Sequence, residues 1–201
     1  TNHLEKIAKK KNIKLIFIST DQIFNKKKSF KNEKLKKNPC NFYGYTKSLA
    51  EEYLLKNNPN SLIIRTNFFG YGNKSRISFS DWILTNIRKK KKISLFSDVY
   101  FNPLYLKHLN IYLLKLIKLN ASGIYNLVSD DKISKYDFGK ILSNIFNEDQ
   151  NFIIKSKISE NKKLIKRPKD MTLSNKKLKS KIGYKKINLQ NQIKIMLKDK
   201  R

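Results

Sequence analysis

The sequence predicts an α/β fold built around a parallel sheet. Short apolar runs rich in isoleucine and phenylalanine alternate along the chain with segments in which apolar residues recur at helical spacing. This alternation is typical of parallel strands joined by crossover helices. A run that is apolar at nearly every position fits a strand covered on both faces. The 201 residues allow one domain, or one domain and part of a second.

The elements can be assigned in order along the chain. The apolar runs predict strands at 13–18, 61–65, 93–96 and 123–128. Helical spacing predicts helices over 4–11, 43–56, 79–87, 104–119, a segment that begins at Ser134, and 189–197. In the second of these helices we expect Leu49 and Leu54 on the apolar side. The segments 25–41 and 68–73 are predicted to be loops, because the first is polar and both contain proline or glycine.

The formal net charge of +30 has more than one explanation. A strongly basic surface suits nucleic acid, because binding releases counterions from the phosphates. About 40 of the 45 basic residues are lysine, however, whereas nucleic-acid surfaces favour arginine, whose planar fork matches phosphate and guanine. The abundant residue types share A/T-rich codons, so codon drift is the favoured explanation and we expect no nucleic-acid partner. Attraction to anionic small molecules or membrane surfaces stays open.

Composition also excludes several classes of protein. The single cysteine excludes a disulfide framework and a thiolate metal cluster. The two histidines, His3 and His108, lie far apart without ligand spacing, so no metal site is expected. No apolar run approaches the roughly 18 residues that a membrane span requires. We therefore expect a cytoplasmic protein with no membrane association.

Polar side chains from three segments are predicted to meet at one edge of the sheet. They are Ser19, Thr20 and Asp21 after the first strand, Tyr43 and Lys47 at the start of the second helix, and Arg65 at the end of the second strand. Ligands of an open α/β sheet bind just beyond the carboxyl ends of its strands. A hydroxyl group at that edge can hydrogen-bond to a substrate carbonyl.

Tyr43 and Lys47 stand four residues apart, on one face of the predicted helix. A phenol ordinarily titrates near pH 10, and a nearby ammonium favours its ionised form. Such a pair can protonate the alkoxide that forms when hydride reaches a carbonyl. The ammonium can also donate hydrogen bonds to the ribose of a cofactor. The alternative is that the tyrosine only packs at the start of the helix.

The order of these segments resembles the extended short-chain dehydrogenase/reductase superfamily, in particular its dTDP-4-dehydrorhamnose reductase-like, sugar-nucleotide-binding branch. The matching segments are FISTDQIF (17–24), NPCNFYGYTKSLAEE (38–52), LIIRTNFFG (62–70), SFSDWIL (78–84), FNPLY (101–105), GIYNLVSDDKISKYDFG (123–139) and RPKDMTLSNKKL (167–178). The resemblance implies a Rossmann-like, doubly wound sheet, of which this chain holds the C-terminal part, with a small α/β substrate-binding cap.

The resemblance also implies roles for individual residues. Thr20 orients the sugar carbonyl, Tyr43 is the acid–base group, and Lys47 binds the cofactor ribose and tunes Tyr43. Asp21 and Phe68 stand where the family contacts the sugar nucleotide. Arg167 resembles an arginine that holds nucleotide phosphate in related enzymes. Ser19 and Arg65, at the same edge of the sheet, are assigned to cofactor binding together with Tyr43 and Lys47.

The same resemblance predicts the organisation of the chain. Residues 1–150 are expected to form a partial NAD(P)-binding domain, with substrate-binding segments at about 67–105. Residues 151–201 are expected to form the small cap and a C-terminal helix. The lysine-dense region from about residue 150 could instead be disordered, but its regularly placed apolar residues, as at 152–154, favour a folded cap.

The sequence departs from the family in two ways. No G-x-x-G-x-x-G motif, which cradles the cofactor pyrophosphate, occurs in the 201 residues. About 80 family residues are therefore expected to be absent before Thr1, and the chain alone is expected to be inactive. In addition, Gln22 stands where the reductases carry tyrosine and the 4,6-dehydratases carry a glutamate base, and Phe68 replaces a tryptophan. Glutamine cannot take a proton, which disfavours dehydration.

The sequence thus predicts NAD(P)H-dependent reduction of a keto group on a nucleotide-linked sugar, serving surface-polysaccharide synthesis. The alternatives are a sugar-nucleotide epimerase and a non-catalytic sugar-nucleotide-binding subunit of the same fold. Cys40, three residues before Tyr43, is a second candidate acid–base group. The identity of the sugar, the choice between NADH and NADPH, and assembly as a homodimer are left open.

Overall fold

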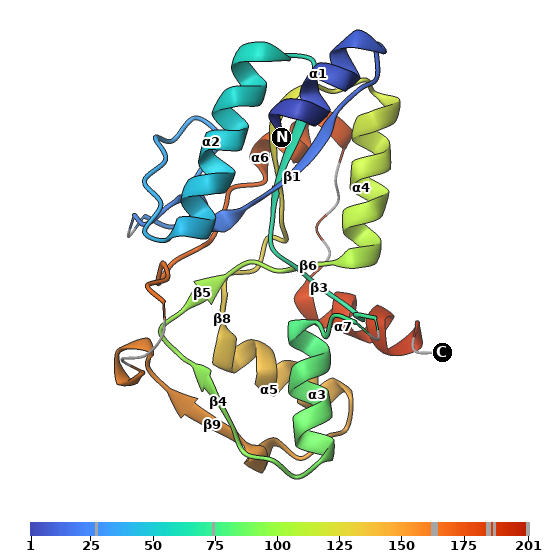
Figure 1. Ribbon diagram of the computed structural model, residues 1–201. Coiled ribbons are helices and arrows are strands. Elements are labelled where there is room, and N and C mark those ends of the chain that lie inside the picture. Colours follow the sequence, from blue (N-terminus) through green and yellow to red (C-terminus); the bar gives the residue numbers. More distant parts are fainter. Residues whose placement is uncertain (27, 74, 162–164, 184–185, 187, 200–201) are drawn as a thin grey trace.

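A computed structural model describes the chain except residues 27, 74, 162–164, 184–185, 187 and 200–201. Its upper part is built on a parallel sheet in the order β1 (Ile16–Thr20), β2 (Leu62–Thr66) and β7 (Gly123–Leu127) (Figure 1). The central strand β2 is buried along its whole length. The predicted α/β fold with a parallel sheet is therefore confirmed.

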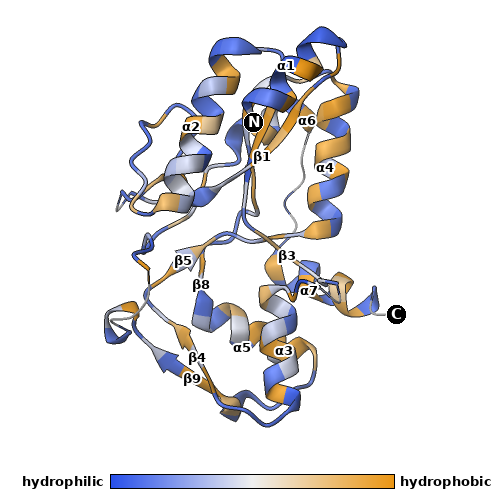
Figure 2. Cartoon of the chain, viewed as in Figure 1, coloured by the Kyte–Doolittle hydropathy of each residue, from blue (hydrophilic) through white to orange (hydrophobic). Residues whose placement is uncertain are grey.

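Helices cover both faces of this sheet. On one face, α4 (Leu106–Lys118) and α6 (Lys176–Ile182) form a hydrophobic cluster with the strands, which includes Leu62, Ile64 and Leu116. On the other face lies α2 (Phe42–Asn57), and α1 (Asn2–Lys10) packs beside α2. Side chains of β2 alternate between the faces, as the pleat requires. Figure 2 shows apolar residues gathered on the strands and on α4.

The lower part of the molecule has a hydrophobic core of its own (Figure 1). It is formed around a parallel pair, β4 (Ile93–Phe96) and β9 (Ile153–Ser156), with α3 (Phe79–Arg88), α5 (Lys135–Ile145) and α7 (Leu189–Lys198). Phe138 and Leu142 of α5 are fully buried in it. This core draws on residues from both sides of the predicted boundary at 150/151, and that boundary stays a prediction.

Short elements connect the two parts. A parallel pair joins β3 (Phe68–Phe69) to β6 (Leu104–Tyr105), and an antiparallel pair joins β5 (Tyr100–Phe101) to β8 (Ile133–Ser134). Single 3₁₀ turns lie at η1 (Asp21–Ile23), η2 (Gln150–Phe152) and η3 (Ile158–Glu160). These short strands carry the chain from the sheet to the lower core and back.

Several sequence-based expectations need correction. The first strand begins at Ile16 rather than at residue 13. The helix predicted from 104 begins at Leu106, because Leu104 belongs to a strand and pairs with Phe68. Leu49, expected on the buried side of α2, is exposed, and Glu51 lies inside instead. The helix predicted to begin at Ser134 is found, with Ser134 as its N-cap, since the Ser134 hydroxyl accepts a hydrogen bond from the Asp137 amide at 3.0 Å.

Candidate active site at the carboxyl edge of the sheet

The strands β1 and β2 end level with one another, since Thr20 is paired with Thr66. The chain turns directly after Thr20 into η1, and the Thr20 hydroxyl accepts a hydrogen bond from the Gln22 amide at 3.3 Å. Thr20 and Asp21 are both buried. The edge where the sequence predicts a ligand therefore carries a hydroxyl and a carboxyl group side by side.

The start of α2 is held against η1 by a hydrogen bond from Asn41 and by close packing at Gly44. Asn41 caps the helix by accepting a hydrogen bond from the Gly44 amide at 2.8 Å, and its amide donates to the Gln22 side chain at 3.1 Å. A Cβ atom on Gly44 would collide with the carbonyl oxygen of Gln22, so only glycine allows the helix to approach this closely. Tyr43, the preceding residue, is thereby placed beside the segment that follows β1.

Tyr43 and Lys47 lie together on α2, as their spacing predicts. The Lys47 ammonium is 6.0 Å from the centroid of the Tyr43 ring and 4.8 Å from that of Phe17. It donates a hydrogen bond to the Ile18 carbonyl at 2.9 Å, which places it over β1 near its carboxyl end. Tyr43 is half-exposed. The three residues predicted to be catalytic, Thr20, Tyr43 and Lys47, thus lie on elements in direct contact.

Ser19 and Arg65 lie beneath this edge and both contact the buried Glu51, Arg65 as an ion pair and Ser19 through a hydrogen bond. The Arg65 guanidinium donates to both carboxylate oxygens of Glu51, at 3.0 and 2.7 Å, and the Ser19 hydroxyl donates to the same carboxylate at 2.6 Å. Arg65 and Glu51 are 1% and 0% exposed. These contacts tie β1, β2 and α2 together. The assignment of Ser19 and Arg65 to cofactor binding stays a prediction.

Asp21 is joined to both Thr20 and Asn67. One oxygen of its carboxyl group accepts a hydrogen bond from the Thr20 hydroxyl at 3.2 Å, and the other accepts one from the Asn67 amide at 2.5 Å. Burial raises the pKa of Asp21, while the hydrogen bond from Asn67 and the charge of Lys135 act in the opposite direction. Asp21 therefore fixes the orientation of its neighbours from below the edge.

A cavity of about 320 Å³ opens between this edge and the lower core. Its lining includes Gln22, Asn67, Phe79, Trp82, Lys135 and Arg167. Arg167 is exposed and also lines an adjoining hollow of about 840 Å³. Phe68 lies in a different hollow, of about 290 Å³, which shares Phe79 with the cavity. The substrate-binding roles of Asp21, Phe68 and Arg167 stay predictions.

Sequence reasoning missed Asn67, Glu51 and Lys135 at this site. Asn67 and Lys135 lie inside segments that carry the family resemblance, but nothing in the sequence shows that they meet the end of β1. Cys40, the alternative acid–base group, is partly buried, and burial raises the pKa of its thiol. A raised thiol pKa leaves less of the reactive thiolate at neutral pH.

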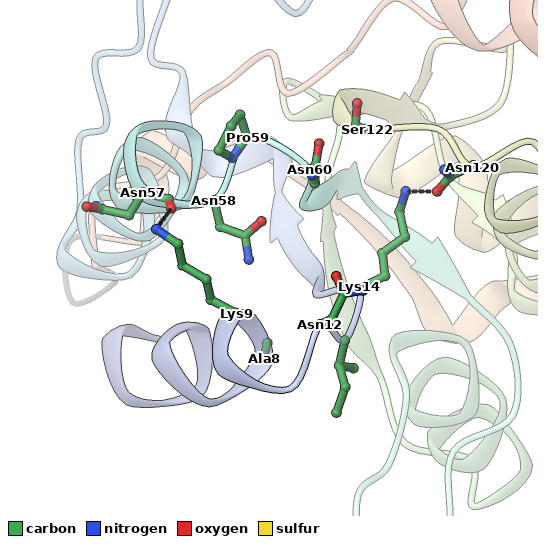
Figure 3. A pocket seen from close by; sticks show the side chains of 11 residues that line it. Ala8, Lys9, Asn12, Lys14, Asn57, Asn58, Pro59, Asn60, Asn120 and Ser122 are labelled. Carbon is green, nitrogen blue, oxygen red and sulfur yellow. Dashed lines mark hydrogen bonds between the residues drawn. The ribbon is translucent and has the colours of Figure 1, made fainter.

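A second polar hollow lies at the opposite end of the sheet (Figure 3). It is lined by residues that precede the three strands, among them Asn12, Lys14, Asn60 and Asn120. Lys14 donates a hydrogen bond to the side chain of Asn120 at 2.6 Å across it. Because ligands of parallel sheets bind at the carboxyl ends of the strands, this hollow is not the candidate site.

The described residues contain no group of three or more histidine, cysteine, aspartate or glutamate side chains placed to hold a metal ion. No helix among them has the length and apolar character needed to cross a membrane.

The chain is similar in sequence to a known protein. The chain is 23% identical over 195 residues to the Haloferax volcanii protein named "Probable low-salt glycan biosynthesis reductase Agl14", and the match covers 94% of this chain and 65% of the relative. The chain thus spans about two thirds of the length of that relative.

Solved structures share the fold. A dTDP-4-dehydrorhamnose reductase from Clostridium acetobutylicum superposes with a TM-score of 0.88 at 24% identity, covering 97% of this chain and 69% of that one. The reductase of the same name from Bacillus anthracis, in complex with NADP, gives a TM-score of 0.85 at 23% identity, covering 94% and 66%. The family model described as RmlD substrate binding domain matches residues 1–201, and this chain therefore belongs to the RmlD substrate-binding domain family.

Proposed function

We propose that this chain is the substrate-binding and acid–base part of a cytoplasmic NAD(P)H-dependent reductase. It reduces the keto group of a nucleotide-linked sugar, of the dTDP-4-dehydrorhamnose type, for surface-polysaccharide synthesis. One observation carries the proposal: Thr20, Tyr43 and Lys47 lie on contacting elements at the carboxyl edge of a parallel sheet, and Gln22 and Asn67 from that edge line a cavity together with Arg167. The names of the relatives point to the same chemistry.

The proton comes from Tyr43. As the substrate carbonyl becomes an alkoxide, the phenol of Tyr43 gives its proton to that oxygen. The Lys47 ammonium lies 6.0 Å from the centroid of the tyrosine ring, one turn further along the same helix. The half-exposed position of Tyr43 leaves the phenol open to a ligand at the edge of the sheet.

Thr20 orients the carbonyl. Its hydroxyl now donates to Asp21 and accepts from the Gln22 amide, so its position is set by protein groups before a substrate arrives. Rotation of the hydroxyl proton from Asp21 toward the substrate oxygen requires no movement of heavy atoms. Such pre-organisation keeps reacting groups aligned, which is one of the larger contributions an enzyme makes.

The residues present fit one end of a nicotinamide cofactor. When bound, NAD(P)H supplies the hydride. The Lys47 ammonium is exposed where it meets the Ile18 carbonyl, and with the Tyr43 phenol it offers donors that suit ribose hydroxyls. No glycine-rich loop for the pyrophosphate occurs in the 201 residues. Tyr43 and Lys47 therefore hold the ribose next to the nicotinamide, and the pyrophosphate requires residues outside this chain.

The proposal is tested by kinetics on the protein in which this chain occurs. We expect consumption of NADPH or NADH with dTDP-4-dehydrorhamnose, and a fall in kcat of about 10²- to 10⁴-fold in Tyr43→Phe, with little change in KM. Tyr45→Phe is the matched control, because Tyr45 lies on the same helix and is as exposed as Tyr43. Unchanged turnover in Tyr43→Phe would remove the assigned mechanism.

A further inference from the structure

Lys135 is a charged residue of the cavity that the proposed mechanism does not use. It is the first residue of α5, directly after the N-cap Ser134. Its side chain lies against two aromatic rings, with the ammonium 3.3 Å from the centroid of Phe101 and 4.7 Å from that of Phe79. It lines the 320 Å³ cavity together with Asn67 and Arg167.

This location is unfavourable for a cation in the unliganded protein. The first turn of a helix carries partial positive charge and favours anions, and Arg167 adds a second positive charge nearby. Burial lowers the pKa of Lys135 to about 7, although Asp21 opposes the shift. Over the described residues, no hydrogen bond or ion pair reaches the ammonium, and the ring faces and Asp21 compensate it only in part.

A purely structural role does not explain this lysine. Between two phenylalanine rings, a methionine of similar length would pack equally well without the cost of burying a charge. An ammonium that keeps all three of its donors free at the wall of a cavity, with a perturbed pKa, is instead typical of a group that meets a ligand. The ligand must then supply acceptor oxygens.

The surroundings indicate which part of the ligand lies here. Arg167 reaches both the cavity and the adjoining hollow, which is also lined by Lys166 and by two lysines paired with carboxylates, Lys132 with Asp170 and Lys169 with Asp98. Among the described residues, the cations on that side without a carboxylate partner, Arg167 and Lys166, suit a diphosphate. Lys135 lies against Phe79 and Phe101 instead, and the cavity also presents Trp82, an apolar ring suited to the C–H face of a sugar. Asn67, which shares the cavity, leads through Asp21 to Thr20.

We propose that the ammonium of Lys135 binds an oxygen substituent of the sugar ring, so that the site selects nucleotide sugars that carry an acceptor oxygen there. This inference rests on the proposed function, and it assigns Lys135 to the sugar and not to the nucleotide. Lys135 donates to the substituent while Thr20 receives the keto oxygen. A sugar that lacks the substituent leaves the ammonium without a partner, which costs affinity.

The test separates sugar binding from nucleotide binding. Titration calorimetry on the protein in which this chain occurs uses dTDP-glucose and dTDP as probes, with Lys135→Met compared with wild type. We expect Lys135→Met to weaken the affinity for dTDP-glucose by about ten- to hundredfold, the range for a hydrogen bond to a charged group. The affinity for dTDP should change by less than about twofold. Lys140→Met is the matched control, because Lys140 lies on the same helix and does not line the cavity.

Two further readouts exclude a structural effect. The melting temperature of ligand-free Lys135→Met should equal or exceed that of wild type, because a partly buried charge without a hydrogen-bond partner among the described residues is removed. If it falls, Lys135→Gln, which keeps a neutral donor, replaces it in the titration. Raising the pH from about 6 to about 8.5 should weaken the binding of dTDP-glucose, whose phosphates do not titrate in this range, to wild type, because the ammonium loses its proton. The same change should alter the binding of dTDP-glucose to Lys135→Met much less, which separates Lys135 from its charged neighbours Asp21 and Arg167.

An equal loss for both probes, or no loss for dTDP-glucose, overturns the assignment of Lys135 while leaving the proposed function in place. If wild type binds neither probe, and adding either probe leaves its melting curve unchanged, the proposed sugar-nucleotide site is wrong and this inference is wrong with it.

Discussion

At the scale of single residues, the pair formed by Glu51 and Arg65 decides how rigid the candidate site is. Both charges are removed from water, and the two hydrogen bonds between them, with the bond from Ser19, satisfy the carboxylate. The Arg65 guanidinium also lies 5.3 Å from the centroid of the Phe24 ring. A buried ion pair contributes little net stability, but removing one partner leaves the other as a buried charge without a counter-charge.

We expect Glu51→Gln to lower the free energy of unfolding by about 3–5 kcal/mol, because Arg65 is left buried without a counter-charge. The double substitution Glu51→Met with Arg65→Met should recover most of this loss, since it removes both buried charges of the pair, while Lys37, which also contacts Glu51 at 3.6 Å, keeps its ion pair with Glu52. Urea denaturation measures all of these proteins. Glu160→Gln is the control, because Glu160 is exposed and glutamine can keep its hydrogen bond to the Lys157 amide. Equal losses in Glu51→Gln and Glu160→Gln would contradict the structural role of the pair.

At the scale of elements, the spacing of apolar residues predicts the long helices and strands but not the short ones. The helices near 79–88 and 135–145 and the strands of the main sheet follow from their apolar spacing. The paired strands of two residues, such as β5 and β8, have no period to detect, and their partners lie far along the chain. On α2, apolar spacing places Leu49 inside, but the ion pair of Glu51 with Arg65 sets the orientation of the helix.

The same distinction holds for the candidate site. Thr20, Tyr43 and Lys47 could be predicted because each stands in a local motif next to a strand or on one helical face. Asn67 and Lys135 could not, because their importance arises from contacts between segments separated by dozens of residues. A local motif identifies functional residues within one element, whereas the residues that line the cavity are determined by how several elements pack together.

The contact of α2 with η1 gives a prediction at this scale. In an exposed helix, replacing glycine by alanine stabilises by about 1 kcal/mol. At Gly44 the added methyl group collides with the Gln22 carbonyl, so Gly44→Ala should instead destabilise by about 1–3 kcal/mol. It should also lower kcat in the protein in which this chain occurs, since α2 carries Tyr43. Thermal unfolding measures the first effect, with Thr46→Ala, exposed on the same helix turn, as control. A stabilised Gly44→Ala would contradict the close approach.

At the scale of the whole molecule, the cavity depends on how the sheet and the lower core are held together, since its lining draws on both. Asp170 joins three distant segments beside it. Its carboxylate accepts hydrogen bonds from Ser29 and Lys132, each at 2.6 Å, and lies 3.4 Å from the ammonium of Lys31. The side chain of Lys31 is fully buried. This network fixes the loop after β1 and the segment before β8 to the C-terminal region.

Asp170 should therefore contribute more to stability than an ordinary surface carboxylate. Burial alone would raise its pKa, but the hydrogen bonds from Lys132, Ser29 and Thr172 outweigh burial and hold the pKa well below its usual range. Because the folded protein binds this proton less readily than the unfolded chain, the contribution is complete above the ordinary aspartate pKa of about 3.9 and is lost as the pH falls below it.

Asp170→Asn should lower the free energy of unfolding at pH 7 by about 3 kcal/mol, because Lys31 then keeps a buried charge without its partner. Near pH 3 the gap between wild type and variant should narrow, since the unfolded wild-type chain binds a proton at Asp170 at that pH while the folded protein still holds Asp170 ionised. Urea denaturation at the two pH values measures both effects. Asp149→Asn is the control, because Asp149 is exposed and asparagine can keep its hydrogen bond to the Asn151 amide. If the two variants unfold alike at pH 7, the Asp170 network does not hold the two parts of the molecule together, and the cavity between them must be fixed by the short strands alone.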